Sequence, residues 1–218
     1  MKIAHLADVH FRGLSRLDEY ERAFTKMFGQ LRGLSPDVIA ICGDVFDTKT
    51  QGISPEVIDL LVWWFRELSS ICPVHIILGN HDGNLANRQR QDAITPILNA
   101  MKNTNIFLYK KSGVYPFAPG YNWCVFSLFD EDGWKNVKPV DGDVNIALFH
   151  GTVFSSITDS GFELESEITV DFFNGYDFVL LGDIHSHQYL SYREVEMIVT
   201  EEELKKYPGA DVVEIFDE

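Results

Sequence analysis

Side chains of the kind that bind metals follow five short apolar stretches of this chain. The stretches are residues 3–7, 38–42, 74–78, 144–149 and 178–181. The side chains that follow them are Asp8, His10, Asp44, Asn80, His81, His150, Asp183 and His185. Carboxylate, amide and imidazole groups without a thiolate favour hard divalent cations over a tetrahedral structural zinc site. The sequence therefore predicts a metal centre, and Asp44, which follows Gly43, is the carboxylate expected to bridge two ions.

This ligand set also predicts a reaction. Two divalent ions about 3.5–4 Å apart supply a nucleophile from water at neutral pH and stabilise a phosphoryl group from both sides. The expected chemistry is hydrolysis of a phosphoester. A purely structural role is disfavoured, because burying unpaired Asp, Asn and His side chains costs several kcal/mol. His5 and His75 lie within or at the start of an apolar stretch and are expected to be core residues, and Asp47 is expected to be structural.

The five apolar stretches are expected to be strands that position these side chains. Continuous apolar runs of this length are typical of buried strands in a parallel or mixed sheet. In open α/β sheets the ligand crevice lies outside the carboxyl ends of the strands. Five strands that each end in a polar ligand therefore predict one shared site.

Helical patterns separate the strands. Apolar residues from Tyr20 to Leu31 recur at helical spacing. Ser54-Pro55-Glu56 has the composition of a helix start, and the helix after it is apolar almost all round. Such a helix is either deeply buried or part of an interface, so a homodimer through this helix and the next is expected. A third helix is expected over residues 89–101, although Pro96 lies within it.

Residues 105–128 are expected to be strands of a second sheet, with a turn over residues 115–122. The fold class that follows is α/β, as a two-sheet α/β/β/α sandwich. Residues 1–190 are expected to form the catalytic domain. Residues 191–218 are expected to be an acidic segment that is the remnant of a cap region.

Composition agrees with one domain that lies outside membranes. The chain has 218 residues, of which 45% are hydrophobic, and no apolar run approaches the roughly 18 residues of a membrane span. The N-terminus has no signal-peptide pattern. Three cysteines with no metal-type spacing predict free, buried thiols in a reducing compartment, and we expect a cytoplasmic protein.

The net charge of −15 is unusual for a protein that binds nucleic acid, because such proteins carry basic patches. Some of this charge comes from the expected metal ligands, and much of the rest lies in residues 194–218. Arg88 and Arg90 either face a phosphate backbone or are solvated residues at a helix start. Overall charge bears on association and not on which bond is cut.

The motif order resembles that of the calcineurin-like metallophosphoesterases over about residues 1–190. The motifs are Asp8-x-His10, Gly43-Asp44, Gly79-Asn80-His81-Asp82, His150-Gly151 and Gly182-Asp183-Ile184-His185. Residues 43–48 and 79–97 look most like the SbcD-type nuclease subunits of DNA double-strand-break repair in bacteria and phages. Those proteins work with an SMC-like ABC ATPase of the SbcC type, so the resemblance implies DNA and such an ATPase as partners.

The resemblance implies a role for each motif residue. One metal would be held by Asp8, His10, Asp44 and His185, and the other by Asp44, Asn80, His150 and Asp183. His81 would be the histidine that stabilises or protonates the leaving oxygen, and Asp82 would orient its ring. The family usually has Gly-His-x-His where this chain has Asp183, which favours Mn²⁺, or alternatively Mg²⁺, over softer metals. A shifted register that uses His185 and His187 is the alternative.

Three functions remain open at this point. The first is a Mn²⁺-dependent DNA exonuclease or endonuclease in repair or recombination. The second is a small-molecule phosphodiesterase or phosphatase with the same site, which the acidic charge favours. The third is a non-catalytic scaffold, which the complete ligand set and His81 disfavour.

Overall fold

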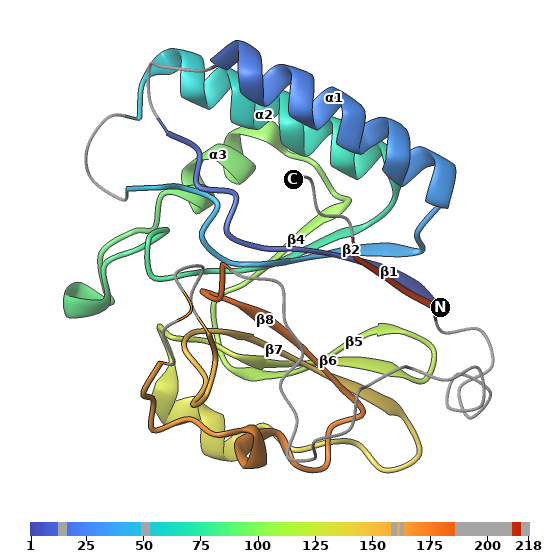
Figure 1. The fold of residues 1–218 in the computed structure, drawn as a ribbon, viewed down its shortest axis with the longest axis vertical. Helices are drawn as coiled ribbons and strands as arrows, with labels where there is room; N and C mark the ends of the chain where they lie inside the picture. Colours follow the sequence, from blue (N-terminus) through green and yellow to red (C-terminus); the bar gives the residue numbers. More distant parts are fainter. Residues whose placement is uncertain (13–16, 49–52, 158–160, 162–163, 186–210, 215–218) are drawn as a thin grey trace.

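Two β-sheets lie face to face, and α-helices cover the outer face of the first sheet (Figure 1). The computed structural model describes residues 1–12, 17–48, 53–157, 161 and 164–185, and the backbone of 211–214. The expected α/β fold with two stacked sheets is confirmed.

The first sheet is parallel, and it carries three of the five expected strands. Its order is β4-β3-β2-β1-β9. Its strands are β1 Lys2–Leu6, β2 Val38–Cys42, β3 Val74–Ile77, β4 Ile106–Tyr109 and β9 Asp211–Glu214. The backbone of β9 pairs with β1, so residues 211–214 of the acidic segment belong to this sheet. The rest of residues 191–218 lies outside the described residues.

The second sheet is mixed and has the order β5-β6-β7-β8. Its strands are β5 Gly113–Ala118, β6 Tyr121–Phe126, β7 Val144–His150 and β8 Phe178–Gly182. Strands β5 and β6 are antiparallel, and β6, β7 and β8 run parallel. Two expectations were wrong. All strands of residues 105–128 were expected in the second sheet, but β4 joins the first sheet through β3. The turn expected over residues 115–122 is confined to Pro119 and Gly120, where Gly120 adopts a φ of 74°.

Two of the three helices lie where the sequence places them. The helices are α1 Leu17–Leu34, α2 Pro55–Ile71 and α3 Ile94–Met101. The side chain of Ser54 caps α2 by accepting a hydrogen bond from the backbone of Val57. Helix α3 starts later than expected, because the Asp92 carboxylate accepts hydrogen bonds from the backbone N–H groups of Ile94 and Thr95. Pro96 then falls in the first turn, where no donor is required.

Helix α2 has two apolar faces, and another helix covers the second one. Trp64 and Phe65 are fully buried against the first sheet. Trp63 packs edge-on against Phe28 of α1, with ring centroids 5.2 Å apart. The apolar pattern of α2 is therefore satisfied within the chain, and it no longer supports a homodimer.

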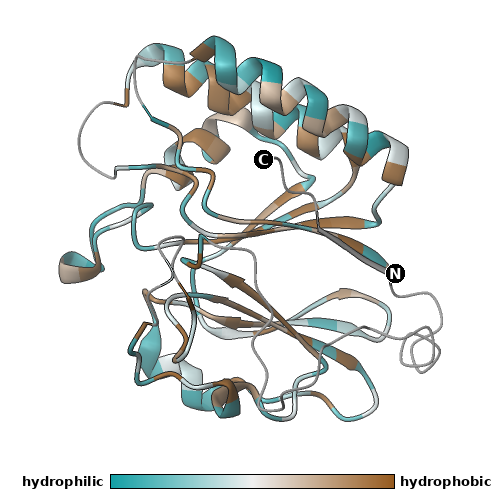
Figure 2. Ribbon diagram, viewed as in Figure 1, coloured by the Kyte–Doolittle hydropathy of each residue, from teal (hydrophilic) through white to brown (hydrophobic). Residues whose placement is uncertain are grey.

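The outer face of the second sheet is covered by short 3₁₀ helices in the described part of the chain. These are η2 Glu131–Asn136 and η3 Val170–Phe173. Trp134 of η2 and Phe173 of η3 both pack against Phe149 of β7, with ring centroids 5.6 Å apart in each pair. Figure 2 shows the result: hydrophobic residues concentrate on the strands and on the inner faces of the helices.

Alternation along β2 divides its side chains between two cores. Ile39 and Ile41 point toward the helices, whereas Val38, Ala40 and Cys42 point toward the second sheet. All five are buried. This central strand is therefore fixed on both faces, and the residues that follow it have a rigid base.

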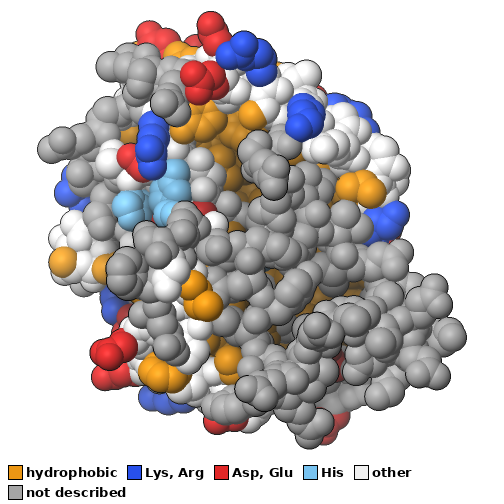
Figure 3. All heavy atoms as spheres, viewed as in Figure 1, with side chains coloured by type: hydrophobic (Ala, Val, Ile, Leu, Met, Phe, Trp, Pro, Cys, Tyr) orange, Lys and Arg blue, Asp and Glu red, His pale blue; other side chains and the backbone are white. Residues whose placement is uncertain are grey.

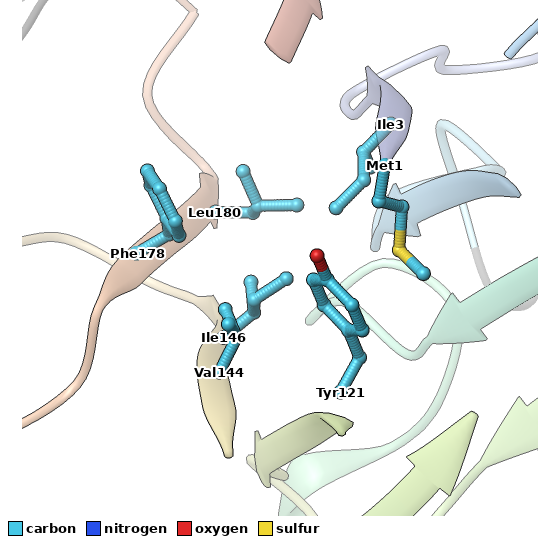
Figure 4. Close-up of a pocket in the computed structure, with 7 residues that line it drawn as sticks. All are labelled: Met1, Ile3, Tyr121, Val144, Ile146, Phe178 and Leu180. Carbon is cyan, nitrogen blue, oxygen red and sulfur yellow. The ribbon is translucent and has the colours of Figure 1, made fainter. Parts of the chain in front are cut away.

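A small apolar cavity lies between the sheets at the amino ends of the strands. It has a volume of about 10 Å³, and Met1, Tyr121 and Phe178 are among its lining residues (Figure 4). That is roughly the space of one water molecule, and an apolar lining gives a water no partner. The cavity is therefore a packing defect at the end of the sheets away from the expected ligands.

The cysteine and membrane expectations can be compared with the described residues. Cys42, Cys72 and Cys124 are free and buried, as expected. None of the described helices combines the length and apolarity needed to cross a bilayer.

Candidate metal centre

All eight expected site residues lie together at the carboxyl ends of the strands. Asp8 and His10 follow β1, Asp44 follows β2, and Asn80 and His81 follow β3. His150 ends β7, and Asp183 and His185 follow β8. The first sheet thus supplies five of these side chains and the second sheet three. His187 lies outside the described residues.

Four of these residues have an unusual backbone conformation. Asp8, His10, Asp44 and Asp183 have φ values of 54°, 49°, 50° and 76°. Residues other than glycine rarely adopt positive φ, although Asp and His do so more readily than most. Each such residue costs about 1–3 kcal/mol and persists only where its surroundings hold it. Their concentration after three strands marks this edge as a functional site.

The first ligand group joins the two sheets. His10 and His185 approach each other with their Nε2 atoms 3.3 Å apart. His10 Nε2 also lies 3.8 Å from Asp44 Oδ2. Ligand atoms of Asp8, His10 and His185 fall within 4.8 Å of one another. This is three of the four residues expected for one metal, and Asp44 adjoins them.

The second group surrounds the buried carboxylate of Asp44. His150 Nε2 lies 3.4 Å from Asp44 Oδ1 and 3.8 Å from Asp183 Oδ1. One end of the Asn80 amide lies 3.0 and 3.2 Å from the two Asp44 oxygens. With its nitrogen at that end, Asn80 donates to Asp44, and with its oxygen there it can bind a cation. Asp44 therefore stands between both expected ligand groups.

The structure fixes which ring nitrogen of His150 faces the site. His150 Nδ1 lies 2.7 Å from the backbone oxygen of Cys42, which can only accept a hydrogen bond. Nδ1 must therefore carry a proton, and Nε2 points at Asp44 and Asn80. A metal-binding histidine is usually oriented in this way by a backbone carbonyl.

Burial and charge act against each other on these groups. Burial lowers the pKa of His150, but the neighbouring Asp44 and Asp8 carboxylates and the Cys42 carbonyl raise it overall to about 9. Burial also raises the pKa of Asp44, but His150 and the backbone of His81 lower it overall. Burial raises the pKa of Asp8 and lowers the pKa of His10. Asp44 is therefore held in its charged form more firmly than Asp8.

Asp183 stands where related motifs have histidine, and two contacts hold it. Its backbone N–H donates to the Asp8 carboxylate at 3.0 Å. Its Oδ2 accepts a hydrogen bond from Thr152 Oγ1 at 2.9 Å. Oδ1 is the atom directed at His150. Thr152, which the motifs do not reveal, therefore orients the Asp183 carboxylate.

Thr152→Val should weaken binding of the second metal by about tenfold to a hundredfold, the usual effect of removing a hydrogen-bond partner of a metal ligand. The valine keeps the branched shape but loses the hydroxyl. Isothermal titration with Mn²⁺ measures the change, and Thr152→Ser, which keeps the hydroxyl, is the matched control. Wild-type affinity in Thr152→Val would show that Asp183 needs no such partner.

His81 is oriented by a residue other than the one expected. Its Nδ1 donates to the backbone oxygen of Asp47, and its Nε2 lies 4.0 Å from Asp44 Oδ2. Asp82 instead accepts hydrogen bonds from the backbone N–H groups of Phe46 and Gly79. The orienting role given to Asp82 was therefore wrong. Burial raises the pKa of Asp82 to about 7, and its contacts tie together the loops after β2 and β3.

Two glycines allow the ligands to come this close. Gly43 has a φ of 86°, and a Cβ there would lie 2.8 Å from the Cα of Gly79. A Cβ on Gly182 would lie 2.6 Å from Nδ1 of His150. Real Cβ atoms do not approach other atoms so closely, so neither position tolerates a side chain without moving a ligand.

An open pocket of about 560 Å³ leads to these side chains. Figure 3 shows histidines gathered on one face, with a basic and an acidic side chain beside them. The pocket is lined by His10, Arg12, Asp44, Asp47, His81, Thr152, Ile157, Leu164, Asp183, Ile184 and His185. Arg88 and Arg90 do not line it, and Arg88 pairs with Glu131 at 2.8 Å. Their expected contact with a phosphate backbone thus has no support in this geometry.

The donor set fits two hard divalent cations. The Nε2 atoms of His10 and His185 face each other at 3.3 Å, and which of them donates depends on the tautomers of the two rings. The Nδ1 atom of His10 is buried without a hydrogen-bond partner. Asp8, Asp44 and Asp183 supply carboxylates, and the described ligand atoms include no sulfur. Carboxylate oxygens and imidazole nitrogens are common ligands of divalent cations in proteins.

The expectation that His75 is a core residue is confirmed. His75 is 4% exposed, and its ring stacks on Phe107 and Tyr109. Burial lowers its pKa to about 4, so it is neutral at pH 7. His5 lies within β1 and is half-buried.

Comparison with known proteins identifies relatives. The chain is 38% identical over 206 residues to the uncharacterized protein R555 of Acanthamoeba polyphaga mimivirus, covering 87% of this chain and 15% of that protein. It is 29% identical over 213 residues to the DNA double-strand break repair protein Mre11 of Methanopyrus kandleri, covering 85% and 44%. It is 34% identical over 89 residues to a subunit of the nuclease SbcCD of Staphylococcus epidermidis, covering 38% and 23%.

The chain spans less than half the length of each of these relatives. Among solved structures, the nuclease MPE of Pseudomonas putida matches with a TM-score of 0.39 at 15% identity, over 74% of this chain and 66% of that one. The decisive match is to a family, because it covers residues 1–187 and so includes every motif residue discussed above. By that match, this chain belongs to the calcineurin-like phosphoesterase family.

Proposed function

We propose that this chain is a two-metal, Mn²⁺-dependent phosphodiester hydrolase that cuts DNA in repair or recombination. The observation that carries the proposal is the convergence of both ligand groups on the single buried carboxylate of Asp44, at the base of an open pocket. In this proposal Asp8, His10, Asp44 and His185 hold one ion, and Asp44, Asn80, His150 and Asp183 hold the other.

The bound ions would lower the pKa of a water and stabilise negative charge on the phosphoryl group. The protein's own residues prepare this chemistry. The Cys42 carbonyl keeps a proton on Nδ1 of His150, so Nε2 is the nitrogen that would bind an ion on giving up its own proton. His81, held by the Asp47 carbonyl, presents Nε2 to the pocket, where it can hold a proton for the leaving oxygen. Proton donation of this kind requires reach before it requires a tuned pKa.

The choice of DNA as substrate rests on the relatives. The Mre11 protein is named for repair of DNA double-strand breaks, and the staphylococcal relative is named as part of a nuclease. By the same likeness we propose an SbcC-type SMC-like ABC ATPase as partner. A homodimer remains part of the proposal from likeness alone, since Trp63 is covered by α1.

A second candidate is a small-molecule phosphodiesterase or phosphatase. The net charge of −15 favours it, because a strongly acidic surface repels a polyanion.

An activity assay separates these candidates. The purified chain, supplied with Mn²⁺, should cleave single-stranded and hairpin DNA as well as bis-p-nitrophenyl phosphate. A chelator should abolish both activities, and excess Mn²⁺ should restore them. Hydrolysis of the small diester without cleavage of any DNA would favour the second candidate.

A further inference from the structure

We propose that Arg12 binds a second phosphate of the substrate, next to the one that is cut. The pocket would then prefer a chain of nucleotides to a diester that has a single phosphate. This inference rests on the proposed hydrolase function, which it deepens by naming a residue that selects the substrate.

The backbone of Arg12 is fixed from three sides. The preceding residue, Phe11, is 3% exposed and bridges to Phe46 beyond the end of β2. The backbone N–H of Arg12 donates to the hydroxyl of Tyr20 at 3.1 Å, and that hydroxyl donates to the backbone oxygen of His10 at 2.8 Å. Arg12 thus projects from the same rigid turn that carries the expected ligand His10.

The side chain of Arg12 is free to meet a ligand at low cost. It is 69% exposed, and its Nε lies 3.1 Å from Asp47 Oδ1. The same Asp47 oxygen lies 3.9 Å from His10 Nδ1, so this ion pair adjoins the metal ligands. An exposed ion pair contributes only about 0–1 kcal/mol. A phosphate can therefore replace Asp47 as the partner of the Arg12 guanidinium. The planar guanidinium binds two phosphate oxygens at once.

The charge distribution in the described part of the chain gives this role to Arg12. Among the pocket-lining residues in the described part of the chain, Arg12 is the only lysine or arginine. The carboxylates that share the lining are Asp44, Asp47 and Asp183. Asp44 and Asp183 belong to the two proposed ligand groups, so bound metal ions would offset the negative charge of these carboxylates. A phosphate beyond the reach of the metals would find its fixed positive charge at Arg12.

The lining of the pocket also contains apolar side chains. The apolar lining residues are Ile157, Leu164 and Ile184, and Ile157 is 49% exposed. Phe154, which is 46% exposed, lies on the same loop after β7. The loop is held by hydrogen bonds that Leu164 makes with Ser156 and Ser155. An exposed arginine and apolar side chains in one pocket fit a substrate that alternates phosphates with bases, as a polynucleotide does.

The test compares thymidine substrates that differ in the number of phosphates: TpT, with one, and TpTpT, with two. Binding is measured in Ca²⁺ by competition against a fluorescent oligonucleotide, and hydrolysis is measured in Mn²⁺. Wild-type protein should bind TpTpT at least about tenfold more tightly than TpT, as one charge-assisted contact allows. Arg12→Ala should lose that preference, and Arg12→Lys should keep part of it, because lysine offers the charge without the fork.

The control is Arg22→Ala. Arg22 is an exposed arginine on α1 that bonds to the backbone oxygen of Asp18 and does not line the pocket. It should keep the wild-type preference. An Arg12→Ala protein that still prefers TpTpT as strongly as wild type overturns the inference, whatever the hydrolysis data show. The wild-type protein could instead prefer TpTpT, lose this preference in Arg12→Ala, and hydrolyse neither substrate. That result supports the inference and overturns only the proposed function.

Discussion

Asp44→Asn should remove both metal ions and lower turnover on a phosphodiester by about 10³-fold or more. The carboxylate lies between both ligand groups and is 1% exposed, so no other residue can take its place. Asparagine keeps an oxygen that can accept the hydrogen bond from the backbone of His81, which preserves the local fold. It loses the second anionic oxygen that bridges two ions. A loss of several kcal/mol of charge stabilisation in the transition state corresponds to a decrease in turnover of about this size.

Metal content by mass spectrometry and turnover of bis-p-nitrophenyl phosphate measure this change. The matched control is Asp37→Asn. Asp37 is exposed and precedes β2, at the end of that strand away from Asp44. That variant should keep both metals and its full turnover. Two bound ions in Asp44→Asn would contradict the bridging role.

His81→Ala should keep both metals and lose most of its turnover, by about 10²–10⁴-fold, the usual contribution of a general acid or base. The reason is geometric. His81 is 42% exposed in the pocket, and its Nε2 is as far as 4.0 Å from the Asp44 carboxylate. Its Nδ1 is already engaged with the Asp47 carbonyl, so only Nε2 can act on a substrate.

The same variant can prove this assignment wrong. Ligand atoms of His10, Asp44 and His81 lie within 4.8 Å of one another, which is close enough for His81 to bind an ion itself. Loss of one metal from His81→Ala, measured alongside Asp44→Asn, would make His81 a ligand. Retained metal with intact turnover would exclude it from the reaction.

The strands and the clustering of the candidate ligands could be predicted from the sequence because each apolar stretch ends in a polar residue at the place where a strand ends. This prediction required only the local sequence around each strand and no knowledge of contacts between distant residues. The candidate ligands Asp44 after β2 and His150 at the end of β7 both lie at the carboxyl ends of buried strands, each of which is paired in parallel with its neighbour. The exact start of α3 was missed, because the sequence offers several residues that could cap this helix. Only the hydrogen bonds to the Asp92 carboxylate identify Asp92 as the one that does.

Contacts between distant parts of the chain could not be predicted. Asp82 stands beside His81 in sequence, yet the group that orients the ring is a backbone carbonyl 34 residues away. Thr152 holds Asp183 across 31 residues. Backbone atoms carry no residue-type signal, and a single threonine carries a weak one. The positive φ values of Asp8 and Asp44 are also set by the surrounding strands.

The apolar pattern of α2 illustrates a different limit. Burial on two sides is visible in the sequence, but the covering element is not. Phe28 of α1 covers Trp63, and Arg32 of α1 pairs with Glu67 of α2. A second protein chain would produce the same pattern in the sequence. Only the structure distinguishes the two.

Anomalous X-ray diffraction from crystals of the chain soaked in Mn²⁺ tests the central claim most directly. Two peaks are expected about 3.5–4 Å apart, the usual separation in two-metal sites. The Asp44 carboxylate should lie between them, with His10 on one side and His150 on the other. A single peak, or two peaks that do not share Asp44, would contradict the two-metal account of this site.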